Sequence, residues 1–65
     1  MNRENKRIID ALESKYAGNE EALEAIEQAK KDIEYIESKE AAGGYTGQSS
    51  KGKALELEAF LHDWY

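Results

Sequence analysis

The sequence predicts an all-α fold, and three observations support this prediction. The 65 residues include no proline or valine and one threonine, so strand-forming residues are scarce, while Ala, Glu, Lys and Leu predominate. Apolar residues recur at helical spacing in three separate stretches. One long stretch, residues 43–52, breaks the pattern with four glycines. We therefore expect a small three-helix unit, namely a helical hairpin followed by a C-terminal helix after a glycine-rich loop.

The first helix is expected over residues 2–17. Asn2 is a suitable N-cap, because its side chain can accept a hydrogen bond from the first helical turn. The apolar face consists of residues spaced by four, Ile8, Leu12 and Tyr16, with Ile9 beside them. Gly18 suits the left-handed position after a helix, and Asn19 can cap the next one. Such a short connection indicates a helical hairpin.

The second helix is expected over residues 20–42 and has the clearest periodicity in the chain. Its apolar seam has a 4-3-4-3 spacing and consists of Ala22, Ile26, Ala29, Ile33 and Ile36. At about 1.5 Å per residue this helix is roughly 35 Å long, against roughly 24 Å for the first. Ile33 and Ile36 therefore need a cover that the first helix does not provide.

The third helix is expected over residues 53–64, with Ser49 or Ser50 as its cap. Its apolar stripe has a 3-4-3 spacing and consists of Ala54, Leu57, Leu61 and Trp64, with Phe60 at its flank. We expect Trp64 to close the end of the core. The simplest assembly returns this helix along the distal half of the second helix. The sequence also allows a dimer that forms along the Ile33–Ile36 seam.

The length predicts a single domain over residues 1–65 with marginal stability. A chain of this size buries only about 60% of the surface that its unfolded form exposes. Cysteine is absent, so disulfides cannot add stability, and dimerisation would be a common remedy. No stretch approaches the roughly 20 apolar residues of a membrane span, and the N-terminus lacks the apolar region of a signal peptide. We expect a soluble, cytoplasmic protein.

The charge is unevenly distributed along the chain. The formal net charge is −5, and residues 10–40 contribute −6 through ten acids and four lysines. Residues 1–9 carry +2 and residues 41–65 carry −1. This balance disfavours general nucleic-acid binding, because neutralisation of phosphates provides most of the non-specific affinity. It favours a partner with a basic surface.

The sharpest motif lies in the glycine-rich loop. Residues 47–53, GQSSKGK, match the phosphate-loop pattern G-x-x-x-x-G-K. However, Ala54 follows where a Ser or Thr would bind Mg²⁺, and a helix precedes the loop where the motif requires a strand. Nucleotide hydrolysis is therefore not expected. Two readings remain, a weak anion site that uses Lys51 and Lys53, and a flexible connector.

No constellation of catalytic or metal-binding residues is evident. His62 is the only histidine, and its neighbour Glu58 would supply just one further ligand where zinc requires three or four. The serines have no histidine at a recognisable spacing. We expect neither enzymatic activity nor a cofactor.

The sequence therefore favours a small acidic protein–protein interaction module. It would act as a regulator or phage-type inhibitor that docks on a larger basic or nucleic-acid-binding protein. A tyrosine between glycines has no apolar periodicity to join, so Tyr45 is the first candidate contact. The full set of expected contact residues is Glu34, Tyr35, Glu37, Tyr45, Gln48, Lys51 and Lys53. The alternatives are a helix-turn-helix nucleic-acid binder, with Arg3, Lys6 and Arg7 beside the loop, and the anion site at residues 47–53.

Overall fold

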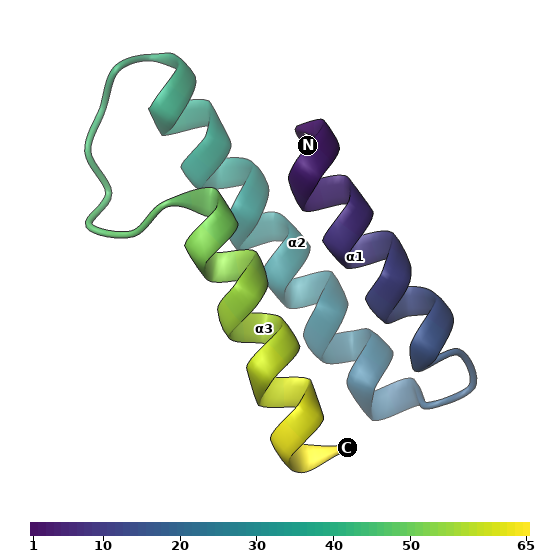
Figure 1. Cartoon of the computed structure of the whole chain (residues 1–65). Helices are drawn as coiled ribbons and strands as arrows, with labels where there is room; N and C mark the ends of the chain where they lie inside the picture. The colour runs from purple at the N-terminus through teal and green to yellow at the C-terminus, as the bar shows by residue number, and fades with distance from the viewer.

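The computed structural model describes residues 1–65 and consists of three α-helices that lie side by side (Figure 1). The helices are α1 (Arg3–Lys15), α2 (Glu20–Ala41) and α3 (Ser50–Trp64). The predicted all-α three-helix unit is confirmed. Both α1 and α3 run antiparallel to α2, and the bundle is elongated, with principal extents of 37 × 19 × 15 Å. None of the three helices combines the length and apolar character that crossing a bilayer requires.

The helix ends of the hairpin follow local sequence signals. The Asn2 side chain accepts a hydrogen bond from the backbone N–H of Asn5, and the Asn19 side chain accepts one from Ala22. Gly18 has a φ of +90°, a conformation that side-chain-bearing residues rarely adopt. The predicted caps and the left-handed glycine are therefore confirmed, and they set the short turn between α1 and α2.

The third helix begins three residues before the expected Lys53. Ser49 is its N-cap, with its hydroxyl accepting a hydrogen bond from the backbone N–H of Gly52 at 2.9 Å. Ser50 opens the helix and is buried against the other two helices. The connection between α2 and α3 is therefore residues 42–49, because contacts with α1 and α2 hold the first turn of α3 in place.

The core is a single apolar cluster to which all three helices contribute. The seam of α2 is buried, as its spacing predicts. Phe60, near the end of α3, lines a groove together with Ala25, near the start of α2. The third helix therefore extends along more than the distal half of α2. The core residues are Ile9, Leu12, Tyr16, Ala22, Ile26, Ala29, Ile33, Ala54, Leu57 and Leu61. The bundle is thus built from small and aliphatic side chains, with Tyr16 as its one aromatic member.

Trp64 does not close the core, contrary to the expectation from its spacing. Its side chain is 71% exposed. Leu61 is the last fully buried residue of α3, and Trp64 lies about one helical turn further along the chain. At that level the neighbouring helices no longer cover α3, so the apolar stripe continues in sequence after the core has ended.

Candidate interaction surface

The loop between α2 and α3 lies on the surface over its whole length. Residues 42–49 are all exposed, and Tyr45 is 94% exposed. Figure 1 shows the loop extending away from the helices. Gly43 and Gly47 have φ values of +80° and +81°, so the path of the loop depends on glycine. The loop therefore presents Tyr45 to the solvent with no apolar neighbour to cover it.

Three of the expected contact residues form no ion pair or side-chain hydrogen bond. Glu34 and Tyr45 are exposed, and Tyr35 is 61% exposed on the outer side of α2. The ammonium group of Lys39 lies 5.6 Å from the centre of the Tyr35 ring, within the range of a cation–π interaction. These side chains are accessible to a partner without breaking a hydrogen bond inside the fold.

The basic and amide residues at the start of α3 are engaged within the chain. Lys51 lies 3.7 Å from the Glu4 carboxylate, and Lys53 lies 3.8 Å from both Asp32 and Glu56. The side-chain amide of Gln48 also donates a hydrogen bond to the Glu56 carboxylate at 2.7 Å. The ion pairs of Lys51 with Glu4 and of Lys53 with Asp32 therefore connect the start of α3 to α1 and α2.

A partly buried polar cluster, which the sequence did not reveal, joins the three helices at this end. Asn5 of α1 is fully buried and donates from Nδ2 to the Glu37 carboxylate at 2.6 Å and to the Ser50 hydroxyl at 2.9 Å. Ser50 in turn donates its hydroxyl to the Glu40 carboxylate at 2.7 Å. We call Asn5, Glu37, Glu40 and Ser50 the polar cluster. Its one unpaired atom is the buried Oδ1 of Asn5.

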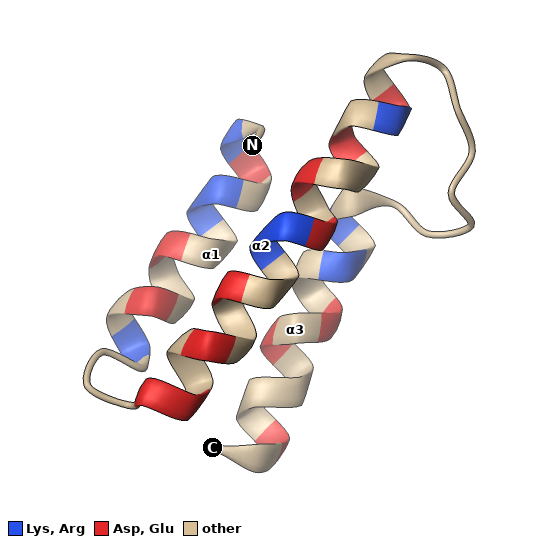
Figure 2. Cartoon of the chain, turned by 180° about the vertical axis from the view of Figure 1, so that it is seen from behind, with Lys and Arg blue, Asp and Glu red and all other residues tan.

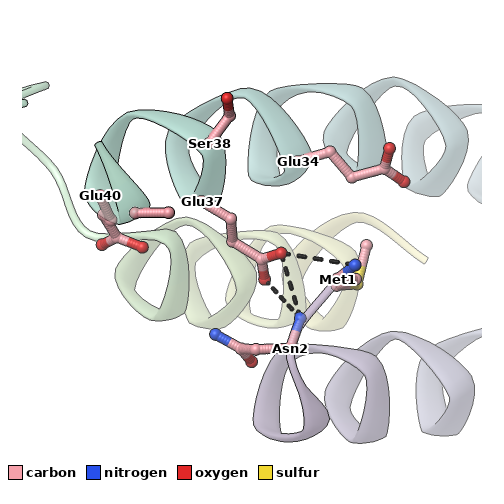
Figure 3. A pocket seen from close by; sticks show the side chains of 7 residues that line it. Met1, Asn2, Glu34, Glu37, Ser38 and Glu40 are labelled. Atoms are coloured by element: carbon pink, nitrogen blue, oxygen red, sulfur yellow. Dashed lines mark hydrogen bonds and ion pairs between the residues drawn. The ribbon is translucent and has the colours of Figure 1, made fainter.

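Glu37 is the anionic centre of this cluster and was expected to contact a partner instead. Its carboxylate accepts hydrogen bonds from the backbone N–H of Asn2 at 3.0 and 3.1 Å and lies 3.5 Å from the ammonium group of Met1 (Figure 3). Burial raises the pKa of Glu37, but the hydrogen bonds from Asn5 and Asn2 and the nearby ammonium outweigh it and lower the pKa overall. Glu37 therefore holds the start of α1 against α2.

Glu40 occupies the place at the start of α3 where an external anion would bind. Its carboxylate accepts from the backbone N–H of Ser50 at 3.1 Å as well as from the Ser50 hydroxyl. The N–H groups of Gly52 and Lys53 also have acceptors in the chain, namely the hydroxyl and carbonyl oxygens of Ser49. Free N–H groups are what make a helix start attractive to anions. This arrangement does not favour the anion site expected at residues 47–53.

The opposite end of the bundle presents an aromatic cluster. The Phe60 ring centre lies 6.2 Å from that of Trp64 and 6.4 Å from that of Tyr65. Phe60 is 44% exposed, and Tyr65 is also exposed. Of the four tyrosines, the phenylalanine and the tryptophan, only Tyr16 is buried. The aromatic side chains that usually stabilise a core thus lie mostly on the surface of this protein.

Unpaired acidic residues surround this aromatic end. Seven side-chain carboxylates of the chain take part in no ion pair, and five of them lie at or near this end: Glu20, Glu21, Glu24, Glu58 and Asp63. Figure 2 shows red residues gathered where α2 begins, while blue residues gather where α1 and α3 begin. The bundle therefore has an acidic aromatic end and a more basic end.

A groove between α2 and α3 leads to the aromatic end. Its floor is apolar, with Ala25 and Ala29 from α2 and Leu57 and Phe60 from α3. Its rim is polar and is formed by Gln28, Asp32, Lys53 and Glu56. The two alanines, four residues apart on one face of α2, leave the space that larger side chains would fill. We refer to this feature as the α2–α3 groove.

Comparisons with protein families, curated proteins and solved structures found no match to this chain. Sequence reasoning missed the exposure of Trp64, because this residue fits the spacing of the core stripe, whereas Phe60 was placed only at the flank of that stripe. A signal was present, since α3 also carries Leu55, outside its buried stripe. A helix with apolar side chains on several sides is typically covered by more than one neighbour. In this small bundle the neighbours cover only one side of α3, so the apolar side chains on its other sides remain exposed.

Proposed function

We propose that this protein is a small acidic, non-enzymatic interaction module that docks on a larger protein with a basic surface, as a regulator or inhibitor. The observation that carries the proposal is the exposure of nearly all its aromatic side chains. Tyr and Trp dominate the energetically important positions of protein interfaces, because they bury a large area at a low entropy cost. Leaving such side chains in water is otherwise unfavourable for a chain with so small a core.

The charge supports a basic partner. The net charge is −5, and five of the seven unpaired side-chain carboxylates lie at or near the end that carries the exposed Phe60, Trp64 and Tyr65. Complementary charge increases the rate of association and disfavours acidic competitors. The helix-turn-helix alternative gains less support, because α2 and α3 lie side by side after a loop of eight residues (42–49), whereas that motif joins its helices by a short turn at a steep angle.

Affinity capture from lysate of the source cells tests this proposal. The immobilised chain is expected to retain a larger protein, and Tyr45→Ala or Trp64→Ala should each reduce the retained amount while the far-UV circular dichroism stays unchanged. Leu23→Ile, a conservative change at a half-buried position, serves as the control. Capture of no specific protein, or of nucleic acid with a steep salt dependence, would count against a protein-docking role.

A further inference from the structure

The α2–α3 groove is left open although its floor is apolar. Ala29 and Leu57 belong to the core, yet the space above them is bounded by Phe60, which is 44% exposed. On the far side of α3, Leu55 is exposed to the same extent. Because Ala29 and Leu57 are already buried, a third apolar surface here would mainly cover the half-buried Ala25 and the exposed aromatic cluster.

We propose that the α2–α3 groove binds an amphipathic helix of the partner protein, with aliphatic residues on its apolar face and Lys or Arg on its flanks. This inference rests on the proposed function and specifies the partner's chemistry. The groove lies between two antiparallel helices, so an incoming helix would complete a four-helix arrangement in which side chains of one helix fill the space between those of its neighbours. The chain has no strand, so an added β-strand has no edge to pair with.

The charges around the groove favour a basic helix, because the one cation on its rim, Lys53, is already paired with Asp32 and Glu56. Glu21 lies four residues before Ala25, and Glu24 lies four residues before Gln28, so both extend the lines of residues that border the groove. Asp63 lies three residues after Phe60, and none of these three acids takes part in an ion pair. Lys and Arg of a partner would meet unpaired carboxylates here, and the exposed face of Trp64 could additionally receive a cation.

The same charges disfavour a second copy of this chain as the occupant. In a two-fold symmetric dimer whose axis passes near Phe60, the aromatic cluster of one copy meets that of the other, so the acids beside the two clusters would also lie close together. Like charges placed together at an interface suppress that pairing. A dimer that instead paired the acidic end of one copy with the more basic end of the other would leave the two aromatic clusters apart.

Trp64 provides a direct reporter, because it is the only tryptophan of the chain. The probe is a synthetic helical peptide of about 18 residues, long enough for several helical turns, with leucines along one face and Arg and Lys elsewhere. Two control peptides keep the length. One has the same composition with the leucines distributed around the helix, and the other has Glu in place of Arg and Lys. We expect the first peptide to shift the Trp64 emission to shorter wavelengths and each control to bind at least about tenfold more weakly.

Matched variants locate the binding site. Phe60→Ala should weaken peptide binding at least about tenfold. Leu55→Ala should change peptide binding less than about twofold. Leu55 is as exposed as Phe60, but it lies five residues earlier and therefore about 140° around the helix, away from the groove. The double variant Glu21→Gln, Glu24→Gln should weaken binding and reduce its salt dependence, whereas Glu34→Gln at the other end should not.

Several results would overturn the inference. One is that either control peptide binds as tightly as the amphipathic basic peptide. Another is that Phe60→Ala and Leu55→Ala weaken binding of that peptide equally. A third is that the Trp64 emission does not change up to about 1 mM of the basic peptide. Sedimentation that reveals a dimer abolished by Phe60→Ala would assign the groove to a second copy instead. Capture of a partner that depends on Tyr45 but not on Phe60 would refute the groove while leaving the proposed function in place.

Discussion

The substitution Asn5→Asp replaces a buried hydrogen-bond donor by a carboxylate of the same size. In the wild-type protein the Nδ2 of Asn5 lies 2.6 Å from the Glu37 carboxylate and 2.9 Å from the Ser50 hydroxyl. In the variant, two carboxylates would face each other at this position. Because the side chain keeps its shape, no cavity forms, and the change in stability reports on the electrostatics of the polar cluster.

Two limits give the size of the effect. Two like charges about 4 Å apart repel each other by about 4 kcal/mol at an effective dielectric constant of 20. The pair can avoid this repulsion by binding a proton, and keeping a carboxyl with an ordinary pKa near 4 protonated at pH 7 also costs about 4 kcal/mol. A core of this size rarely supplies more than about 3–5 kcal/mol. We therefore expect Asn5→Asp to be largely unfolded at pH 7.

The loss of unfolding free energy caused by Asn5→Asp should become smaller as the pH falls. The carboxyl pair that shares a proton has a higher pKa in the folded variant than in the unfolded chain. Binding of this proton therefore stabilises the fold at low pH, and this stabilisation is lost as the pH rises. Urea unfolding followed by circular dichroism at pH 7 and near pH 4 measures the difference in unfolding free energy from the wild type. The control is Asn19→Asp, because aspartate caps a helix about as well as asparagine. An Asn5→Asp protein within about 0.5 kcal/mol of the wild type at pH 7, a change typical of neutral surface sites, would refute the reasoning.

Four further outcomes are expected. Because the pKa of Glu37 is lowered in the fold, its contacts stabilise the protein above the ordinary carboxyl pKa of about 4.3, and this contribution is lost as the pH falls further. Acid titration should therefore destabilise Glu37→Gln less steeply than Glu34→Gln, and parallel curves would contradict this. Gly18→Ala should cost about 1–2 kcal/mol in urea unfolding, because residues with a Cβ rarely adopt a φ of +90°, even though no atom lies close to the added Cβ. A neutral result would mean that the turn can rearrange. Ser49→Ala should cost about 1 kcal/mol, measured as a lower midpoint of thermal unfolding, and an unchanged midpoint would argue against the cap. Ile33→Ala, at a fully buried site, should cost about 2–5 kcal/mol, and a smaller loss in chemical denaturation would indicate a loosely packed seam.

The helices could be predicted because their signals act over short distances. Helix propensity, the caps Asn2 and Asn19 and the glycine at position 18 each involve groups within about four residues. The spacing of the α2 seam likewise predicted which of its faces is buried. The sequence does not distinguish Ser49 from Ser50 as the cap of α3, because serine caps a helix equally well at either position, and only the burial of Ser50 separates them.

The candidate surface was only partly predictable. The exposure of Tyr45 follows from its place between glycines, and it lies on the surface as this composition suggests. Glu37 was expected to contact a partner, but in the fold its carboxylate holds the start of α1. Its partners Met1, Asn2 and Asn5 lie 32 to 36 residues earlier in the chain, and the sequence around Glu37 gives no signal of these contacts.

The order of amino acids alone determined three helices, their caps and the apolar seams, because these depend on hydrogen bonds and spacing within a few residues. Only the packing of the helices decided that Asn5 is buried and that Trp64 is exposed. Asn5 is covered because α3 places Ser50 against it across 45 residues of sequence. Trp64 is uncovered because its neighbours end sooner than its apolar stripe does. Burial depends on which segments reach the same point in space, and periodicity along one helix carries no information about where the other helices stop.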